Sequence, residues 1–354
     1  MDEDKRMEGV LTMGLDLGDR HSHFCLLDAA GAVMEEGRVV TTVEGFGGRF
    51  GSCKPVRIAL EAGTHSPWVS RMLTGFGHEV LVANPRKLRM IYTDDSKSDK
   101  MDAERLARVA RVDPKLLSPI QHRGQQTRTD LGVLRSRDAM VSVRTQLINH
   151  VRGAVKSTGS RLPSCSTGSF HKQVAEQLPA ILRETLLPIV EIIGTLSQRI
   201  RDYDKRIEEM AQKQYPQAQV LSQVPGVGPL TSVAYILTLE DPHRFKSSRA
   251  VGSYLGLRPR QADSGSREPQ LRITKAGDPF LRRLLVGSAQ YILGPFGADT
   301  DLRRWGLALA KRGGKSAKRR AVVAVARKLA VLLHRLWVTG QVYEPLRTKV
   351  SEKA

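Results

Sequence analysis

Apolar residues recur at alternating spacings of four and three along one stretch in the middle of the chain. The positions follow Pro188 and are Ile189, Ile193, Leu196, Ile200, Tyr203, Ile207 and Met210. This spacing forms a heptad seam, which requires a second helix to cover it. A second long helix is predicted over residues 127–156, where apolar residues recur every seven positions at Leu134, Val141, Ile148 and Val155. The seam therefore packs either against this helix in the same chain or against another copy of the chain.

The first third of the chain has a different pattern, made of short β-rich runs. We expect strands over 10–17, 23–27, 32–40, 56–60 and 79–83, with helices over 44–50 and 67–76. Three consecutive strands followed by alternating helices and strands predict a mixed sheet. This order matches a ribonuclease H-like α/β sheet better than a Rossmann unit, which begins with a βαβ element and a glycine-rich turn.

The last third is helical, more basic and richer in glycine. Val224-Pro-Gly-Val-Gly-Pro229 precedes an apolar run and predicts a helix-hairpin-helix turn. Gly226 and Gly228 would let backbone N–H groups at a helix N-terminus approach a phosphate, whereas a plain helix-capping turn is the alternative. We expect an α/β domain over 1–112, a helical coiled-coil segment over 113–212 and a mainly α domain over 213–354.

Charge is the feature of the composition that indicates a partner. The chain has 56 Lys and Arg against 36 Asp and Glu, a net charge of +20, which favours nucleic acid. The densest basic run contains Lys311, Arg312, Lys315, Lys318, Arg319 and Arg320. This run either forms a solvated mobile loop or contacts phosphates. Aromatic residues make up only 5%, which argues against binding led by base stacking and favours backbone contact with duplex DNA or folded RNA.

Cysteine use and hydropathy indicate the compartment. The three cysteines, Cys25, Cys53 and Cys165, form no CxxC pair, so neither a disulfide framework nor a structural zinc site is expected. No apolar run reaches the roughly 18 residues that a membrane-spanning helix needs. We expect a cytoplasmic protein that associates with nucleic acid and not with a membrane.

Four acidic residues are candidates for a metal site. Asp16 and Glu61 each end an apolar strand, and Asp99 and Asp102 lie three apart at a predicted helix start, on one face. Each has an ordinary alternative as an ion-pair partner or helix cap. Together, four carboxylates can hold two divalent ions about 4 Å apart, as in phosphodiester displacement, and oxygen ligands favour Mg²⁺ or Mn²⁺. Other acids compete for this role: Asp19, Asp94, Asp95 and Glu104.

These motifs resemble the DEDD-type insertion-sequence transposases, a family related to the Piv DNA invertases and the RuvC-like Holliday-junction nucleases. Gly14-Leu-Asp16, Leu60-Glu61 and Ser98-Asp-Lys-Met-Asp-Ala103 look like the family's D, E, D and D positions in order. Asp19 stands where a lysine is expected, and Ser98 replaces a usual threonine. The resemblance implies a RuvC-like N-terminal domain in which the four acids bind Mg²⁺, with two ions expected and Mn²⁺ able to substitute.

The C-terminal part is similar to the family's transposase domain. The similarity rests on Arg244-Phe-Lys246, Tyr254-Leu-Gly-Leu-Arg-Pro259, Asp263-Ser-Gly265, Ile273-Thr-Lys-Ala-Gly277, Leu281-Arg-Arg-Leu-Leu285 and Ala321-Val-Val-Ala-Val-Ala-Arg-Lys-Leu329. The family's nucleophilic serine maps to Ser264, and Ser266 is the alternative. Basic residues around it are expected to contact nucleic acid: Arg258, Arg260, Arg267, Arg272, Lys275, Arg282 and Arg283.

The resemblance implies a DNA recombinase that cuts DNA, holds it through a phosphoserine link and rejoins it. It also implies a structured noncoding guide (bridge) RNA, encoded by the element, that pairs with donor and target DNA. A homo-oligomer, either dimer or tetramer, is expected because recombination joins two DNA partners, and the heptad seam is predicted to mediate its assembly. Two alternatives stay open: a RuvC-like Holliday-junction nuclease in which water attacks, and a nucleic-acid-binding scaffold without catalysis. An actin-like ATPase is disfavoured because no second Asp-Gly-Gly phosphate loop is present.

Overall fold

The computed structural model describes residues 11–88, 98–261 and 271–347, without the side chain of Lys315. The chain divides into two compact units, Met1–His122 and Arg123–Ala354. Each unit has its own apolar core. Among the described residues, no helix combines the length and the apolar character needed to cross a membrane.

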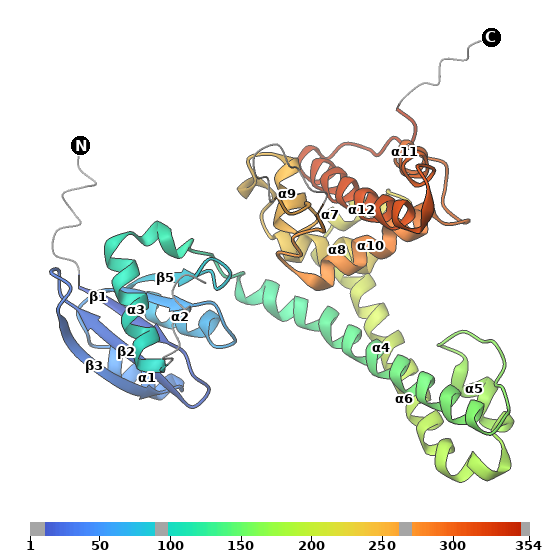
Figure 1. Ribbon diagram of the computed structural model, residues 1–354, viewed down its shortest axis with the longest axis horizontal. Helices are drawn as coiled ribbons and strands as arrows, with labels where there is room; N and C mark the ends of the chain where they lie inside the picture. Colours follow the sequence, from blue (N-terminus) through green and yellow to red (C-terminus); the bar gives the residue numbers. More distant parts are fainter. Residues whose placement is uncertain (1–10, 89–97, 262–270, 348–354) are drawn as a thin grey trace. The chain divides into compact units, whose positions relative to one another are not determined.

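The first unit contains a five-stranded mixed sheet (Figure 1). Its elements are β1 (Thr12–Asp16), β2 (His21–Leu27), β3 (Val33–Val40), α1 (Val43–Phe50), β4 (Arg57–Glu61), α2 (Ser66–Gly75) and β5 (Glu79–Ala83). The spatial order is β3-β2-β1-β4-β5, with antiparallel pairing among the first three strands of the chain and parallel pairing of β4 with β1 and β5. The predicted α/β domain with a mixed sheet is confirmed.

Both faces of the sheet are covered, so its central strands are buried. Met13 and Leu15 point to one face and pack with Phe46 and Leu73 of α1 and α2. Gly14, which lies between them in the strand, faces the other side, where α3 (Asp99–Val112) covers the sheet. The alternation of side chains along a strand therefore decides which residues of β1 meet α3.

The first unit continues beyond the boundary predicted at residues 112/113. After α3, the 3₁₀ helix η3 (Pro114–Leu117) returns to the sheet, where Asn84 N donates to Leu117 O at 3.0 Å and Ile120 N to Val82 O at 2.8 Å. These hydrogen bonds tie the chain up to residue 122 to the first unit. The division into three functional domains stays a prediction.

Two long helices begin the second unit and run side by side (Figure 1). They are α4 (Gln125–Ser157) and α6 (Ala180–Glu209), with α5 (Phe170–Val174) and the 3₁₀ helix η4 (Ala175–Gln177) between them in sequence. The seam residues Ile193, Ile200 and Ile207 are almost completely buried within this single chain. Of the two packings considered, α6 therefore uses the one against the helix of its own chain, and the seam is not available to a second copy.

The helix that carries the seam is longer than expected. We expected it to follow Pro188, but α6 begins at Ala180 and includes Pro188. A proline inside a helix removes one backbone hydrogen bond. Burial of Leu186 and Val190 on either side of it offsets this loss.

The rest of the second unit is helical, as predicted. It contains the π-helix η5 (Met210–Gln214), α7 (Gln217–Ser222), α8 (Pro229–Leu239), the 3₁₀ helix η6 (Pro242–Arg244), α9 (Ser248–Tyr254), α10 (Pro279–Leu293), α11 (Asp301–Ala310) and α12 (Gly314–Thr339). Tyr235 of α8 is fully buried, and its hydroxyl donates to Ala330 O of α12 at 2.6 Å. The interpretation of Lys311–Arg320 as a mobile loop is wrong for residues 314–320, because they form the first turns of α12.

Candidate active site

Asp16 and Glu61 lie at the same edge of the sheet. They are the last residues of β1 and β4, which are parallel neighbours with Leu15 opposite Leu60 in the register. Parallel neighbours end at a common edge, so the strand pairing alone brings these two acids near each other. Both side chains are partly exposed there.

Helix α3 brings the other two acids to this edge. Ser98 caps the helix, because its Oγ accepts a hydrogen bond from Met101 N at 3.3 Å, and Asp99 and Asp102 fall in the first turn. The helix lies directly on β1 at Gly14. A Cβ atom at this glycine would lie 1.9 Å from Ala103 O and 2.5 Å from Ala107 N, so no other residue fits without moving α3.

The electrostatics of Asp16 show that the four predicted acids come together. Burial and, after it, the charges of Asp99, Asp102 and Glu61 together raise the pKa of the Asp16 carboxyl from 3.8 to about 6. The interaction with His23 lowers the pKa of the Asp16 carboxyl. Residues far apart in the sequence therefore form one acidic cluster, which we call the carboxylate cluster: Asp16, Glu61, Asp99 and Asp102.

Members of the carboxylate cluster differ in their environment. The Asp99 side chain is 66% exposed, whereas that of Asp102 is 6% exposed. Among the described residues, none donates a hydrogen bond to the buried Asp102 Oδ1, and Arg105 Nη1 lies 3.9 Å from it. A buried carboxylate oxygen without a partner is energetically costly and favours the presence of a cation.

The cluster has the donor atoms for a metal but no closed ligand shell. In the part of the chain that the structure describes, no three His, Cys, Asp or Glu side chains surround one point as metal ligands do. The carboxylates are near enough to repel one another, and repulsion acts over longer distances than coordination. An all-oxygen set with excess negative charge matches the preference of Mg²⁺ and Mn²⁺.

His23 belongs to this site but was missed in the sequence analysis. It is the register partner of Asp16 across the β1–β2 pair, and its Nδ1 lies 3.7 Å from Asp99 Oδ2. This nitrogen is buried and has no hydrogen-bond partner among the residues that the structure describes. Counting back from the short connection between the first two strands would have placed His23 opposite Asp16, because antiparallel hairpins pair residues at equal distances from their turn.

Two of the four competing acids are engaged elsewhere. Asp19 is almost fully exposed and lies 3.7 Å from His65 Nε2. Glu104 pairs with Arg108 one turn along α3, at 2.6 Å. Asp94 and Asp95 lie outside the described residues.

The candidate nucleophiles, Ser264 and Ser266, also lie outside the described residues, as does Arg267. The structure does describe both ends of their loop. Arg260 N donates to Arg272 O, and Thr274 N donates to Arg258 O, each at 2.9 Å. This short two-stranded pairing brings the exposed side chains of Arg258, Arg260 and Arg272 to the base of residues 262–270. Three arginines expected to contact phosphate therefore lie close together on the described residues that flank the candidate nucleophiles in sequence.

Three further basic residues near this loop have different environments. Lys275 is exposed. Arg282 is half-buried, and its Nη1 donates to Leu255 O at 3.0 Å and to Ala276 O at 2.7 Å. Arg283 pairs with Asp138 of α4 at 2.5 Å. The guanidinium groups of Arg282 and Arg283 are thus already engaged within the second unit, and their nucleic-acid contacts stay predictions.

The predicted helix-hairpin-helix turn joins α7 to α8. Gly226 has a positive φ of 87°, and a Cβ atom there would lie 2.9 Å from Tyr291 Cδ1 of α10. Gly228 is the exposed N-cap of α8, and no side chain caps this helix. Pro229 has no N–H and Ser232 N donates to Gly228 O at 3.0 Å, so an anion at this end would have the N–H groups of Leu230 and Thr231 as donors.

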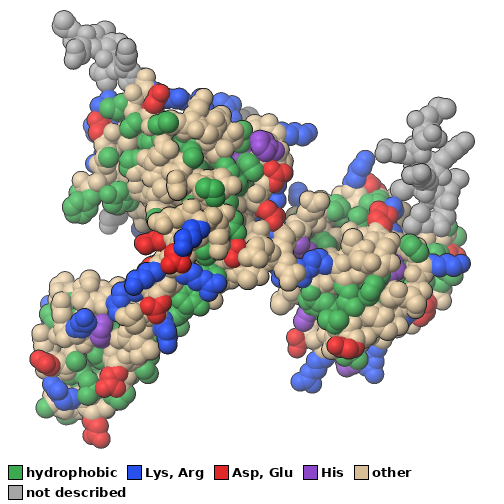
Figure 2. Space-filling model, turned by 180° about the vertical axis from the view of Figure 1, so that it is seen from behind, with side chains coloured by type: hydrophobic (Ala, Val, Ile, Leu, Met, Phe, Trp, Pro, Cys, Tyr) green, Lys and Arg blue, Asp and Glu red, His purple; other side chains and the backbone are tan. Residues whose placement is uncertain are grey.

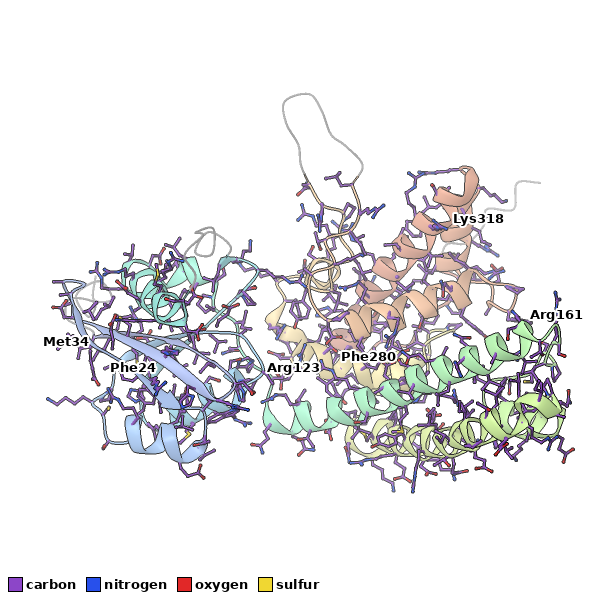
Figure 3. All side chains as sticks on the ribbon, turned by 60° about the horizontal axis from the view of Figure 1, so that its bottom comes forward. Phe24, Met34, Arg123, Arg161, Phe280 and Lys318 are labelled. Atoms are coloured by element: carbon purple, nitrogen blue, oxygen red, sulfur yellow. The ribbon has the colours of Figure 1, made fainter. Side chains whose placement is uncertain are left out.

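The basic run before and within α12 is exposed. This applies to Lys311, Arg312, Lys318, Arg319 and Arg320, and Figure 3 labels Lys318 on this helix. The side chain of Lys315 lies outside the described atoms. The run thus presents positive charge to solvent on the second unit.

Comparison with known proteins agrees with this arrangement. A sequence model of a DEDD-type IS110 transposase matches residues 13–159, which include all four acids of the carboxylate cluster. A second model, described as the transposase IS116/IS110/IS902 family, matches residues 218–296, which include the α7–α8 turn and the loop of Ser264. The chain belongs to the IS110 family of DEDD transposases.

Two relatives that are named as transposases cover most of the chain. It is 28% identical to the transposase for insertion sequence element IS1111A of Coxiella burnetii, over 96% of this chain and 93% of that protein. It is 29% identical to a probable family 20 transposase of Pseudomonas aeruginosa, over 84% of this chain and 88% of that protein. The chain is also 28% identical to the pilin gene-inverting protein of Moraxella lacunata, over 32% of this chain and 35% of that protein.

Proposed function

We propose that this IS110-family transposase cuts and rejoins DNA strands at the carboxylate cluster, where Asp16, Glu61, Asp99 and Asp102 bind Mg²⁺. Two ions are expected, and Mn²⁺ should substitute because the ligands are carboxylates. The observation that carries this proposal is the raised pKa of Asp16, caused by burial and by its three acidic neighbours. Such an arrangement is unstable as four bare charges and becomes favourable when a divalent cation neutralises them.

The chain's own residues position the reacting groups. Bound Mg²⁺ would stabilise the attacking and leaving oxygens of the phosphodiester. The strands hold Asp16 and Glu61, while contact of α3 with β1 at Gly14 holds Asp102 in its buried position. Asp99 faces solvent and lies beside His23, so this side of the cluster is the one that substrate can approach.

We infer that Ser264 supplies the attacking hydroxyl, with Ser266 as the alternative. In this step the serine oxygen bonds to phosphorus, the bond from phosphorus to a deoxyribose oxygen breaks, and that oxygen leaves as a hydroxyl. The serine proton passes to a base or to solvent. Arg258, Arg260 and Arg272 lie at the base of the same loop and would offset the negative charge of the phosphate.

The partners of the proposed reaction are donor and target DNA and a structured noncoding guide RNA. The net charge of +20 and the exposed basic residues on the second unit support contacts with nucleic-acid backbones. A homo-oligomer is expected, either dimer or tetramer. Because the heptad seam is buried within one chain, the contacts between copies must use other surfaces.

Trapping a protein–DNA adduct tests this function. The full chain with Mg²⁺, DNA and RNA recovered with it from its host should form an adduct that survives denaturation. Ser264→Ala should abolish the adduct, and Asp16→Asn should abolish both adduct and cleavage. Asp19→Asn is the matched control, since this exposed acid lies outside the carboxylate cluster.

The same experiment separates the alternatives. Cleavage without an adduct in the wild type would show water as the nucleophile, as in a junction nuclease. Nucleic-acid binding that is unchanged by all four acid substitutions, with no cleavage in any protein, would indicate a scaffold.

A further inference from the structure

Between Asp138 in α4 and Glu176, which precedes α6, the chain contains no acidic residue. The same stretch contains five basic residues: Arg144, Arg152, Lys156, Arg161 and Lys172. This stretch forms the last turns of α4, the loop after it and α5. It lies at the end of the helical pair that is remote from α7–α12, where Figure 3 labels Arg161.

A cavity of about 470 Å³ lies within this stretch. Its lining consists of Arg152, Lys156, Gly159, Ser160, Arg161 and Leu162. Three of these side chains are basic, and the Ser160 hydroxyl adds a neutral hydrogen-bond donor. We call this cavity the basic tip pocket.

Packing fixes one wall of the basic tip pocket. Arg152 Nη2 donates to Pro163 O at 3.1 Å, and the Arg152 guanidinium lies 5.1 Å from the centre of the Phe170 ring. Lys156 and Arg161 are exposed, so their side chains are free to move toward a ligand. The pocket thus combines one positioned guanidinium with two adaptable cations.

The three cations are not neutralised by the protein. Within the described ranges, neither Arg152, Lys156 nor Arg161 pairs with a carboxylate. Other basic residues of the same helices do, since Arg137 pairs with Asp204 at 2.5 Å and Arg135 with Asp278 at 3.0 Å. Figure 2 shows Lys and Arg side chains on the α4–α6 pair, gathered mainly on the part nearer to α7–α12.

A structural role in capping α4 accounts for only part of this charge. The C-terminus of a helix carries a partial charge of about −0.5, which one cation such as Lys156 offsets. Three cations around one cavity leave an excess of positive charge. An anion with several oxygen atoms is the ligand that this excess favours.

We propose that the basic tip pocket binds a phosphate of a nucleic-acid backbone, as a contact separate from the carboxylate cluster. This inference rests on the proposed function, because it takes nucleic acid as the partner. None of the described residues that line the pocket is aromatic, and Arg152 covers the Phe170 ring, so the contact should not depend on base stacking or base sequence. Duplex DNA and folded RNA both carry the phosphodiester that the pocket would recognise.

Binding of the full-length chain in EDTA tests the proposal without cleavage. The probes are a duplex DNA of mixed sequence and a folded stem-loop RNA, each titrated by fluorescence anisotropy at several salt concentrations. The double variant Lys156→Gln/Arg161→Gln should bind at least one probe about tenfold more weakly. Its salt dependence should fall by about 1 to 2 in the slope of log affinity against log salt concentration.

A matched variant controls for the loss of charge alone. Lys205→Gln/Lys213→Gln removes the same charge from exposed positions outside the pocket and should bind as the wild type does. Arg161→Glu, a charge reversal at one exposed position, should weaken binding more than Arg161→Gln. All variants should unfold at the wild-type temperature, because the substituted side chains are exposed.

Each result has a definite meaning. If the pocket variant loses affinity for only one of the two probes, the result supports the proposal and identifies that nucleic acid as the source of the phosphate. If it loses affinity for both probes, the pocket binds the backbone of either nucleic acid. Equal affinity of the pocket and control variants for both probes overturns this inference alone. Failure of the wild-type chain to bind either probe overturns the inference together with the nucleic-acid partners of the proposed function.

Discussion

Gly14 and Ala103 are in backbone contact, so that a Cβ atom at position 14 would lie 1.9 Å from the Ala103 carbonyl oxygen. This contact seats the first turns of α3 on β1. It thereby fixes the distance between Asp16 at the end of the strand and the two acids that begin the helix.

Gly14→Ala should therefore damage the carboxylate cluster without changing any carboxylate. The added methyl group must push α3 away from β1, at a cost of about 1–3 kcal/mol in the free energy of unfolding. DNA cleavage should fall sharply, because the acids separate. Gly48→Ala is the control, since Gly48 lies on an exposed face of α1 and its Cβ would meet nothing within 4 Å. Equal cleavage by both variants, measured with denaturant unfolding on the same samples, would contradict the role of this contact.

Asp16 should make the metal-free protein less stable as pH rises. Its pKa in the folded state is raised from 3.8 to about 6, so folding favours the protonated carboxyl. Stability from this group is complete below pH 3.8 and is lost as pH rises through 6, by on the order of 2 kcal/mol after the shift is discounted for solvent screening of this partly exposed carboxyl. In EDTA, Asp16→Asn should remove this loss and be the more stable protein above pH 6.

Mg²⁺ should reverse this effect in the wild type. Added Mg²⁺ binds the folded state and should raise the melting temperature of the wild type above pH 6, but not that of Asp16→Asn. Melting curves across pH, with and without Mg²⁺, measure both effects. An identical response of the two proteins would show that Asp16 is not in a metal site.

His23→Ala should weaken Mg²⁺ binding and so raise the Mg²⁺ concentration that cleavage requires. The imidazole lies beside Asp99, and groups that support metal ligands typically contribute 10- to 100-fold to affinity. We expect the Mg²⁺ concentration for half-maximal cleavage to rise by about tenfold. His21→Ala on the same strand is exposed and should leave it unchanged. A normal Mg²⁺ requirement in His23→Ala would exclude this role.

Ile200→Ala should lower stability without changing the number of subunits. Ile200 is 3% exposed and packs in the α4–α6 pair, so truncation should cost about 2–4 kcal/mol in the free energy of unfolding. Ile192→Ala, at a 52% exposed position of the same helix, should cost much less. Denaturant unfolding and light scattering measure the two properties. Dissociation of an oligomer in Ile200→Ala with unchanged stability would place the seam between chains.

The local elements followed from the sequence because each depends on residues close together in the chain. The strand Glu79–Ala83 has the predicted ends, and the other four strands differ from prediction by one or two residues at their ends. Pro188 was misleading, since a proline usually limits a helix, but burial of the neighbouring leucine and valine continues α6 through it. Likewise, the sequence after α3 predicts the start of a helical segment, but hydrogen bonds join this part of the chain to the end of β5.

Side-chain types and their order along the chain determined that this protein has strands, two long helices and four candidate acids. Tertiary structure alone decided that the seam faces α4 of its own chain, that Asp102 is buried while Asp99 is exposed, and that His23 joins them. The physical reason is that periodicity specifies which face of an element is apolar, whereas partner and burial depend on contacts between residues distant in sequence. A carboxylate acquires its unusual proton affinity only when folding brings other charges beside it.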